Sequence, residues 1–424
     1  MSTQAFLSGN EAVAEGVRLS RPRVVAAYPI TPQTGVVERL SEMVDNGELL
    51  AEFVHVESEH SALSLVMGSC ATGVRTFTAT SSQGLMYMAE ILYYSSGGRY
   101  PLVMMNANRA LALPWNIYGD QSDSLALISS GWIQAYAEDA QESLDMTIQA
   151  YAIAENPSVR TPVLVNLDGF VLTHTYESVS IPDQADVDAF LPPPDLPDGY
   201  PGTFNLTSPQ SLGITAGPGD YTVFKYLQHR DMLRAAEVIR DTGRRYTAVF
   251  GRGVSELIER YRSEDADFII VTLGSVAGTV RVAVDELRQA GVRVGLLRIR
   301  YLRPFPRDEL NAALLGDGRS TPVRAIGVLE KDISFGHQGS VAMEVKAALY
   351  EHAANERRVP PKVINFVGGL GGQDMTREHI SALFADLAAA DQPTQAASQR
   401  FGQAGSAYFM GLEGYEENIH KNAP

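Results

Sequence analysis

The sequence contains a single cysteine, Cys70, among its 424 residues. One thiol forms no intrachain disulfide and supplies too few ligands for a structural zinc ion or an iron–sulfur cluster. If this protein takes part in electron transfer, the metal centres therefore belong to another chain. Cys70 lies in a stretch of small and apolar residues that predicts a helix, and we expect a buried core thiol rather than a nucleophile.

Long apolar runs and an excess of positive charge are missing too. No window approaches the ~20 apolar residues of a membrane span, and the first ten residues lack a basic stretch followed by an apolar one. We therefore predict no membrane span and no signal peptide, and expect a cytoplasmic protein. The 34 basic and 50 acidic residues give a formal net charge of −16, which argues against binding to nucleic acid or anionic membranes.

Familiar phosphate- and metal-binding motifs are also missing. The chain has no G-x-x-x-x-G-K-[ST], and its closest match to G-x-G-x-x-G, at residues 369–374, lacks the third glycine and follows the last predicted strand. These absences argue against a nicotinamide-dependent dehydrogenase. His55, Glu57 and Glu59 share one face of a predicted strand, but no histidine pair there has metal-site spacing, so we predict no metal site.

What the chain does have is a regular alternation of short apolar runs and helical patterns. The first series predicts strands at residues 23–27, 53–56, 76–80, 101–106 and 163–167. The second predicts strands at residues 268–274, 292–299, 325–329 and 363–367. Such alternation is typical of parallel, doubly wound α/β sheets. A proline-rich stretch separates the two series and indicates a domain boundary.

We therefore predict four parts of the chain. They are a first α/β domain over residues 1–190, a connector over 191–220, a second α/β domain over 221–385 and a C-terminal tail over 386–424 that contacts other subunits.

Polar residues follow the predicted strands at their carboxyl ends, where open α/β sheets bind ligands. Thr31 lies between two prolines directly after the first strand, and Glu59 stands where the second strand gives way to a helix. A carboxylate is expensive to bury without a partner. Two interpretations of Glu59 stay open: an acid favoured by the helix dipole, and a hydrogen-bond partner for a ring nitrogen of a cofactor. Thr31 could equally belong to an ordinary strand-to-helix turn.

Two further strand ends carry small polar or basic residues. Residues 80–84 form a small polar loop that allows close approach of a ligand, although Ser81 or Ser82 could simply cap a helix. Arg109 follows the fourth strand and is a bidentate donor suited to a carboxylate. An irregular aromatic and acidic loop follows at residues 114–123; loops of this kind often carry function, and the alternative is a surface loop anchored by Trp115.

Taken together, these motifs resemble the α subunit of the pyruvate:ferredoxin oxidoreductase family, the thiamine-dependent 2-oxoacid:acceptor oxidoreductases. The resemblance runs in order through residues 28–32, 57–60, 80–84, 108–110 and 119–123. Residues 302–306, 336–339 and 368–374 are similar to the second domain of that family. The resemblance covers about residues 5–385.

This resemblance implies a doubly wound, pyrimidine-type thiamine diphosphate-binding domain followed by a transketolase C-terminal-like α/β domain. It implies oxidative decarboxylation of a 2-oxo acid to an acyl-CoA and carbon dioxide, with coenzyme A as co-substrate. The cofactor would lie between subunits, with its diphosphate and Mg²⁺ held mainly by a β subunit. Electrons would pass to iron–sulfur clusters on the β subunit and on a ferredoxin-like δ subunit. A γ subunit completes the implied assembly, and this chain binds no cluster itself.

The resemblance also assigns roles to residues. The implied catalytic residues are Glu59, Thr31 and Arg109. Cofactor contacts would come from Glu59, Tyr28, Pro29, Ser82 and Gln83. The substrate pocket would be lined by Thr31, Arg109, Trp115, Asn116, Gln121 and Asp123.

Two departures from the family pattern bear on the substrate. Gln121 replaces a histidine associated with pyruvate-specific members, and Trp115 puts a bulky ring beside the expected pocket. Pyruvate is the default substrate, and either departure would suit an aromatic 2-oxo acid such as phenylglyoxylate. Two other interpretations stay open: a non-catalytic assembly subunit of such a complex, and a thiamine enzyme without electron transfer.

Overall fold

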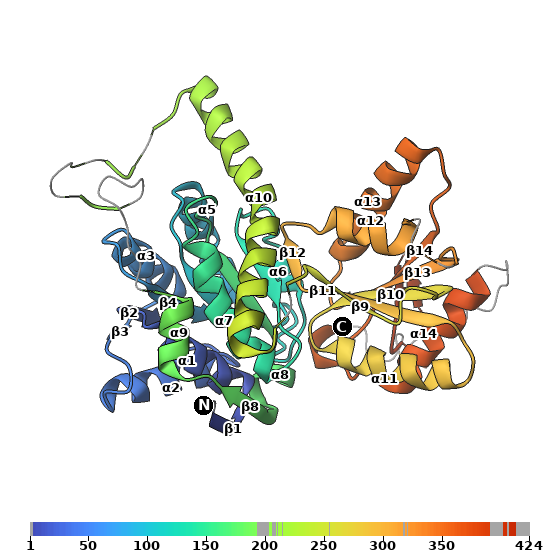
Figure 1. Cartoon of the computed structure of the whole chain (residues 1–424), viewed down its shortest axis with the longest axis horizontal. Helices are drawn as coiled ribbons and strands as arrows, with labels where there is room; N and C mark the ends of the chain where they lie inside the picture. Colours follow the sequence, from blue (N-terminus) through green and yellow to red (C-terminus); the bar gives the residue numbers. More distant parts are fainter. Residues whose placement is uncertain are drawn as a thin grey trace.

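A computed structural model gives the fold. It describes residues 3–192, 203–205, 209, 211–213, 215–253, 255–316, 319, 321–390, 402–404 and 407–412. Figure 1 shows two α/β bodies side by side, the first built from the N-terminal half of the chain. Among the helices that the structure describes, none combines the length and apolarity needed to cross a bilayer.

The first body is built on a seven-stranded sheet of order β12-β6-β7-β5-β4-β2-β3. Its strands are β2 (Val24–Ala27), β3 (Glu52–His55), β4 (Thr76–Thr80), β5 (Val103–Asn108), β6 (Ile133–Tyr136), β7 (Val163–Asp168) and β12 (Tyr301–Arg303). A separate antiparallel pair is formed by β1 (Thr3–Ser8) and β8 (Tyr176–Ile181). All neighbours in the large sheet are parallel except β12, which comes from the second half of the chain and pairs antiparallel with β6.

Helices cover both faces of this sheet. They are α1 (Gly9–Ser20), α2 (Thr34–Asp45), α3 (Glu59–Cys70), α4 (Gln83–Tyr87), α5 (Ala89–Gly97), α6 (Ser122–Leu125), α7 (Ala140–Ala154), α8 (Val171–His174), α9 (Gln184–Phe190) and α10 (Pro218–Phe250). A capping box starts α1: Ser8 caps the helix, and the Glu11 carboxylate accepts a hydrogen bond from the Ser8 backbone N–H. The side chain of Ser58 caps α3 by accepting from Ser61 N, which places Glu59 in the first turn.

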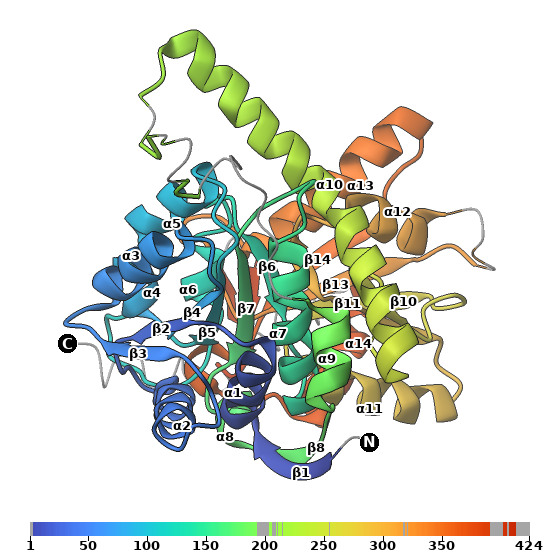
Figure 2. The same ribbon diagram turned by 60° about the vertical axis from the view of Figure 1, so that its left-hand side comes forward.

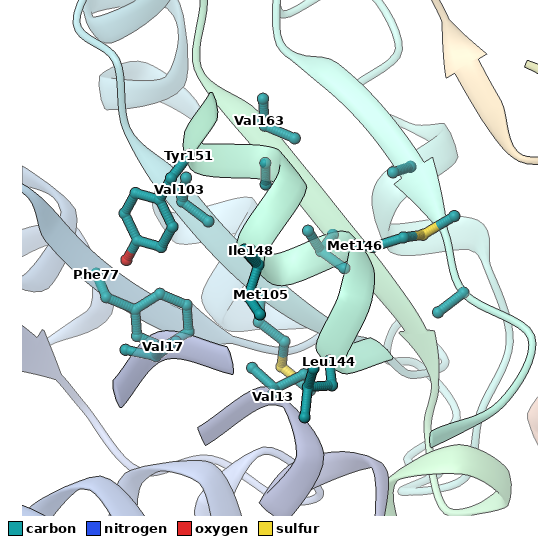
Figure 3. Close-up of a cluster of buried hydrophobic side chains, with 14 of the residues drawn as sticks. Val13, Val17, Phe77, Val103, Met105, Leu144, Met146, Ile148, Tyr151 and Val163 are labelled. Carbon is teal, nitrogen blue, oxygen red and sulfur yellow. The ribbon is translucent and has the colours of Figure 1, made fainter. Parts of the chain in front are cut away.

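The core between α1, α7 and the sheet is built mainly from apolar side chains. Figure 3 shows Val13 and Val17 of α1 facing Leu144 and Ile148 of α7 over the strand residues. Tyr151 is fully buried, and its hydroxyl donates to Thr76 O at 3.1 Å, so the ring packs without an unpaired polar atom. Burying such side chains contributes roughly 1.5–3 kcal/mol each and holds the strands in fixed positions.

The second body contains another seven-stranded sheet, of order β15-β16-β14-β13-β10-β11-β9. Its elements are β9 (Ile258–Tyr261), β10 (Phe268–Leu273), α11 (Val276–Gln289), β11 (Val294–Ile299), α12 (Arg307–Leu315), β13 (Ala325–Glu330), α13 (Ser340–Glu356), β14 (Lys362–Val367), η1 (Leu370–Gly372), α14 (Arg377–Ala390), β15 (Gly402–Ala404) and β16 (Ala407–Phe409). Strands β11, β10, β13, β14 and β16 are parallel, and β9 and β15 pair antiparallel at the two edges. The predicted parallel α/β character is thus confirmed for both halves.

The long helix α10 packs differently from the sequence prediction. We expected residues 221–385 to form the second domain, but α10 buries Val238, Ile239 and Tyr246 in the core of the first body, against α7 and α9. Its first turns project beyond both bodies (Figures 1 and 2). An amphipathic pattern shows that one face of a helix is buried but not against which body. We therefore propose that the domain boundary follows Phe250.

Half of the predicted connector at residues 191–220 lies outside the described residues. The same holds for most of the predicted tail, residues 386–424. Within the described part of that tail, β16 pairs with β14, so this piece of the tail packs into the second sheet. Contact between the tail and other subunits stays a prediction.

A buried network of charges joins the two bodies. Arg298 of β11 is 1% exposed and pairs with Glu138 and Glu142 of the first body, while Arg281 of α11 pairs with Glu138 as well. Burial alone would raise the pKa of Glu142, but Arg298 and Arg300 lower it overall. Removing one member of such a network leaves a buried charge without a partner, so the two bodies are held in one relative position.

Candidate active site

Parallel strands bring the predicted site residues to one edge of the first sheet. The last residues of neighbouring strands are in register: Ala27 of β2 with His55 of β3, and Thr80 of β4 with Asn106 of β5. Thr31, Glu59, Ser82 and Arg109 follow the ends of β2, β3, β4 and β5 respectively. The prediction that these strand ends share an edge is confirmed.

Glu59 is a carboxylate in an unusual setting. Its side chain is only 9% exposed, yet it accepts no hydrogen bond from any residue that the structure describes. The Thr80 hydroxyl is also buried and has no partner within the described ranges. Gly84 lies against both groups, because a Cβ atom there would overlap with Thr80 Oγ1 and Glu59 Oε1. Buried polar groups without partners are costly, so this cradle suits a polar ligand.

The carboxylate of Asp123 accepts several hydrogen bonds at the ends of β4 and β5. The residue is fully buried, and burial, with a smaller contribution from nearby Asp120, raises its pKa to about 6. Its carboxylate accepts hydrogen bonds from Ser82 N (3.0 Å), Asn106 Nδ2 (3.2 Å), Asn108 Nδ2 (2.8 Å), Arg109 N (3.2 Å) and Ser124 N (2.7 Å). We predicted that Asp123 lines the pocket. The structure instead buries it under the pocket, where it fixes the ends of β4 and β5.

Ser82, which is bonded to Asp123, adopts a strained backbone conformation with φ 51° and ψ −122°. Its N–H bonds to Asp123, and its hydroxyl donates to Ala110 O at 2.6 Å. A non-glycine residue in such a region costs roughly 1–3 kcal/mol and persists where its surroundings dictate it. Gln83 follows at the start of α4 and is half-buried; contact of Ser82 and Gln83 with a cofactor stays a prediction.

Arg109 and Thr31 are in direct contact. Arg109 Nη1 donates to Thr31 O at 2.8 Å, and Nε donates to Asn116 O at 3.3 Å, while Nη2 bonds to no group of the described residues. Arg109 is 5% exposed, and burial lowers its pKa, with Asp123 opposing that effect. The guanidinium still carries its charge at neutral pH, because an arginine pKa starts above 12. One edge of the guanidinium is thus held by the protein, and one nitrogen is free to donate.

The aromatic loop after Arg109 is exposed beside it. Trp115 is 70% exposed, and its ring centroid lies 6.0 Å from the Arg109 guanidinium carbon. Asn116 donates from Nδ2 to Gly371 O of the second body and accepts from Tyr118 N. At the neighbouring strand end, Tyr28 is 37% exposed and Pro29 is exposed. Contact of these four residues, Trp115, Asn116, Tyr28 and Pro29, with a cofactor or substrate stays a prediction.

Gln121 lies elsewhere than predicted. We placed it in the substrate pocket, but it is 1% exposed and donates from Nε2 to Asp168 Oδ1 at 2.9 Å. Asp168 also accepts from Ser275 N (2.8 Å) and Lys331 Nζ (3.1 Å) of the second body. Gln121 therefore belongs to the contact between the bodies. Sequence order put it in the functional loop, but the fold turns that part of the loop inward.

The sequence analysis missed Gln33 as a site-shaping residue. Its side chain is fully buried, donates to Ala79 O at 2.7 Å and accepts from Ile30 N at 3.3 Å, so it fixes the Thr31 turn on β4. Asn10 supports the same turn by donating to Pro32 O at 2.9 Å. A polar residue directly after a Pro-bracketed threonine was the available signal for Gln33. Asn10 gave no local signal, because its contact is distant in sequence.

Two family models match the chain. Residues 15–244 match the thiamine diphosphate-binding domain of pyruvate flavodoxin/ferredoxin oxidoreductase, and residues 266–380 match core domain II of pyruvate:ferredoxin oxidoreductase. The first match includes almost all of α10, in line with the packing of that helix on the first body.

Named relatives cover most of the chain. Pyruvate synthase subunit PorA of Methanothermobacter thermautotrophicus is 44% identical over 378 residues, which cover 89% of this chain and 93% of that protein. Ketoisovalerate oxidoreductase subunit VorA of Pyrococcus abyssi is 42% identical over 381 residues, covering 90% of this chain and 92% of that protein. The near-equal identities do not distinguish the two substrates.

A solved structure confirms the predicted fold class. The 2-oxoglutarate:ferredoxin oxidoreductase from Magnetococcus marinus, solved with 2-oxoglutarate, coenzyme A and succinyl-CoA bound, matches with a TM-score of 0.66 at 21% sequence identity. The match covers 90% of this chain and 65% of that chain, so this chain spans about two thirds of its length. The likeness concerns the fold alone, two α/β domains built on largely parallel sheets.

The raised pKa of Asp123 predicts a pH dependence of stability. The unfolded carboxyl group has a pKa near ~4, so the folded chain binds this proton more tightly than the unfolded chain does. The contribution of Asp123 to the free energy of unfolding therefore decreases as the pH rises from about 4 to about 6. Above pH 6 this contribution stays constant. We expect the unfolding free energy of the wild type minus that of Asp123→Asn to fall by roughly 3 kcal/mol over this interval, measured by urea unfolding. A difference that rises with pH would contradict the assignment.

Proposed function

The chain belongs to the pyruvate flavodoxin/ferredoxin oxidoreductase family, and on that premise we propose that it is the α subunit of a CoA-acylating 2-oxoacid oxidoreductase. The 2-oxo acid loses carbon dioxide, its carbonyl carbon is oxidised by two electrons, and coenzyme A takes the acyl group. The electrons leave one at a time to iron–sulfur clusters on partner subunits. The observation that carries this proposal is the Glu59 carboxylate, buried without a hydrogen-bond partner among the described residues, at the same sheet edge as Arg109.

The site residues fit the aminopyrimidine half of thiamine diphosphate. Glu59 offers a carboxylate that is 9% exposed, Thr80 offers a buried hydroxyl without a partner among the described residues, and Gly84 packs directly against both. We assign Glu59 to a ring nitrogen, where it would hold and exchange a proton at its carboxylate oxygen. Tyr28, Pro29, Ser82 and Gln83 would border the ring. When bound, thiamine diphosphate supplies the electron sink for decarboxylation.

The diphosphate and its Mg²⁺ need ligands, and the metal needs a group of side chains able to hold it. Within the described residues, no three histidine, cysteine, aspartate or glutamate side chains are grouped so as to hold a metal ion. We therefore propose that a β subunit supplies this half of the cofactor site. Cys70 offers no cluster ligand, because it is buried and burial raises the pKa of its thiol to about 12. We propose that the clusters lie on the β and ferredoxin-like δ subunits of a complex that also contains a γ subunit.

Arg109 is the proposed ligand of the substrate carboxylate. Its Nη1 and Nε are fixed by backbone carbonyls, which leaves Nη2 to donate a charge-assisted hydrogen bond. Thr31, held by the same guanidinium, would place its hydroxyl beside the bound acid. Trp115 and Asn116 would border the substrate and exclude water from one side.

Pyruvate is the substrate we propose first. The argument for an aromatic acid such as phenylglyoxylate combined Gln121 with Trp115. Gln121 is buried against Asp168, which leaves Trp115 alone to favour a large substrate, and its ring is mostly exposed. A branched acid, 2-oxoisovalerate, ranks beside pyruvate because of the ketoisovalerate oxidoreductase relatives.

A second candidate function is a non-catalytic assembly subunit of the same complex. A non-catalytic subunit is expected to have lost the side chains that carry out the chemistry. Glu59, Thr31 and Arg109 are all present at one edge, and a strained Ser82 is maintained beside them, so the catalytic role is favoured. A thiamine enzyme without electron transfer is the third candidate, and iron in the purified native complex would exclude it.

Glu59→Gln should abolish turnover while the complex still assembles. Gln keeps the volume of the side chain but no longer exchanges a proton, so we expect a loss of at least about 100-fold in kcat. The matched control is Glu57→Gln, an exposed glutamate two residues earlier, which should leave kcat unchanged. Turnover by Glu59→Gln at the control rate would contradict the activating role.

Arg109→Ala should mainly raise the KM for the 2-oxo acid. Loss of one charge-assisted hydrogen bond costs on the order of 1.5–3 kcal/mol, which corresponds to about a 10- to 100-fold change in KM. The control is Arg23→Ala, an exposed arginine just before β2, at the opposite edge of the same sheet. An unchanged KM in steady-state assays would remove Arg109 from the carboxylate site.

The substrate assignment is tested with the purified native complex. Acceptor reduction with coenzyme A should be compared for pyruvate, 2-oxoisovalerate, phenylglyoxylate and 2-oxoglutarate. We expect the highest kcat/KM for pyruvate. Preference for phenylglyoxylate would overturn that ranking and make Trp115 the specificity residue.

A further inference from the structure

A glycine-rich turn of the second body contacts the loop that borders Arg109. The turn, residues 369–372, follows β14 and contains η1, and the loop comprises residues 113–121. Gly372 N donates to Gly119 O at 2.8 Å, and Asn116 Nδ2 donates to Gly371 O at 3.0 Å. Next to the turn, Gln121 N donates to Lys331 O at 2.9 Å. The backbone of the second body thus holds the loop at three places.

Glycine is required in the turn for two physical reasons. Gly371 and Gly372 have φ of 58° and 83°, which L side chains rarely adopt. Their Cβ positions are also occupied: a Cβ at 371 would overlap with Asn116 Nδ2, and a Cβ at 372 would overlap with Tyr118 Cβ. The two bodies therefore approach as closely as backbone allows, and any side chain in the turn must displace the loop.

The loop passes this contact on to Arg109. The Asn116 carbonyl accepts from Arg109 Nε at 3.3 Å, and Tyr118 O accepts from Ala110 N at 3.0 Å. Two of the loop residues that meet the turn, Asn116 and Tyr118, are therefore bonded directly to Arg109 or to its neighbour. Arg109 Nη1 in turn bonds to Thr31 O. A shift of Asn116 and Tyr118 would move the guanidinium relative to Thr31.

We propose that the turn at residues 369–372 is a positioning element of the substrate site. It acts through Asn116 and Tyr118 to set the place of Arg109, so the second body tunes affinity for the 2-oxo acid from the other side of the domain contact. This inference rests on the proposed role of Arg109. It also gives a use to a segment that looked like an incomplete nucleotide-binding motif in the sequence.

Gly372→Ala in the native complex tests the proposal. Because small displacements of a binding group have large effects on binding, we expect KM for the 2-oxo acid to rise about tenfold, with kcat within about twofold of the wild type. The matched control is Gly291→Ala, which has the same φ of 83° but no atom within 4 Å of its Cβ position. Equal KM values in Gly372→Ala and Gly291→Ala would overturn the proposal.

A double-mutant cycle covers the case in which Gly372→Ala fails to fold. Gly371→Ala should raise KM, as should Asn116→Ala, and the double variant should be no worse than Asn116→Ala alone, because the overlap with Nδ2 is gone. Strictly additive effects would contradict the coupling. The cycle thus tests the turn at a second position.

Hydrogen exchange separates this inference from the proposed function. Peptides covering residues 109–121 should exchange faster in Gly372→Ala than in Gly291→Ala, whether or not the complex oxidises a 2-oxo acid. Equal exchange in the two variants would overturn the inference even if the enzyme is active. A wild-type complex without 2-oxo acid-dependent electron transfer would contradict the proposed function, and the exchange result would still decide the coupling.

Discussion

The buried carboxylate of Asp123 is the interaction on which the site depends. It gathers backbone N–H groups from Ser82 and Arg109 and the side-chain amides of Asn106 and Asn108. Without this acceptor, several donors at the ends of β4 and β5 would be buried without partners, each at a cost of about 1–3 kcal/mol. The hydrogen bond from Ser82 N to Asp123 also holds Ser82 in its strained backbone conformation. The positions of Ser82 and Arg109 are therefore set by the fully buried Asp123.

Residues of the second body hold the end of β7 in place. Asp168 at the end of β7 accepts hydrogen bonds from Ser275 and Lys331 of the second body. Burial alone would raise the pKa of Asp168, but the charge of Lys331 and the bonds from Ser275 lower it overall. With the Arg298 network, these contacts fix the two sheets relative to each other. Because the contact between the two bodies is fixed, residues of the second body can position a loop of the first body. These residues need not lie on the outer surface of that loop.

The exposed aromatic residues suit a chain that works as part of a complex. Tyr87 and Tyr94, on the helices that follow β4, are 58% and 62% exposed, and Trp115 beside Arg109 is 70% exposed. Exposed apolar side chains are frequent where another protein binds, in line with the partner subunits that we propose. These exposures agree with a site that has polar groups for the cofactor ring. Among the described residues, this site has no group of side chains that could hold a metal ion. The proposed division of labour between subunits explains both observations.

The sequence by itself determined the two α/β series and the shared sheet edge, and it made Glu59, Thr31 and Arg109 the candidate chemical groups at that edge. Alternating apolar patterns and Pro- and Gly-bracketed strand ends are local signals, and parallel strands necessarily share a carboxyl edge. The tertiary structure alone decided that Asp123 and Gln121 are buried supports and that α10 packs on the first body. Loop residues carry no periodicity that tells inward from outward. Their direction follows from contacts between segments far apart in the chain, such as Gln121 with Lys331.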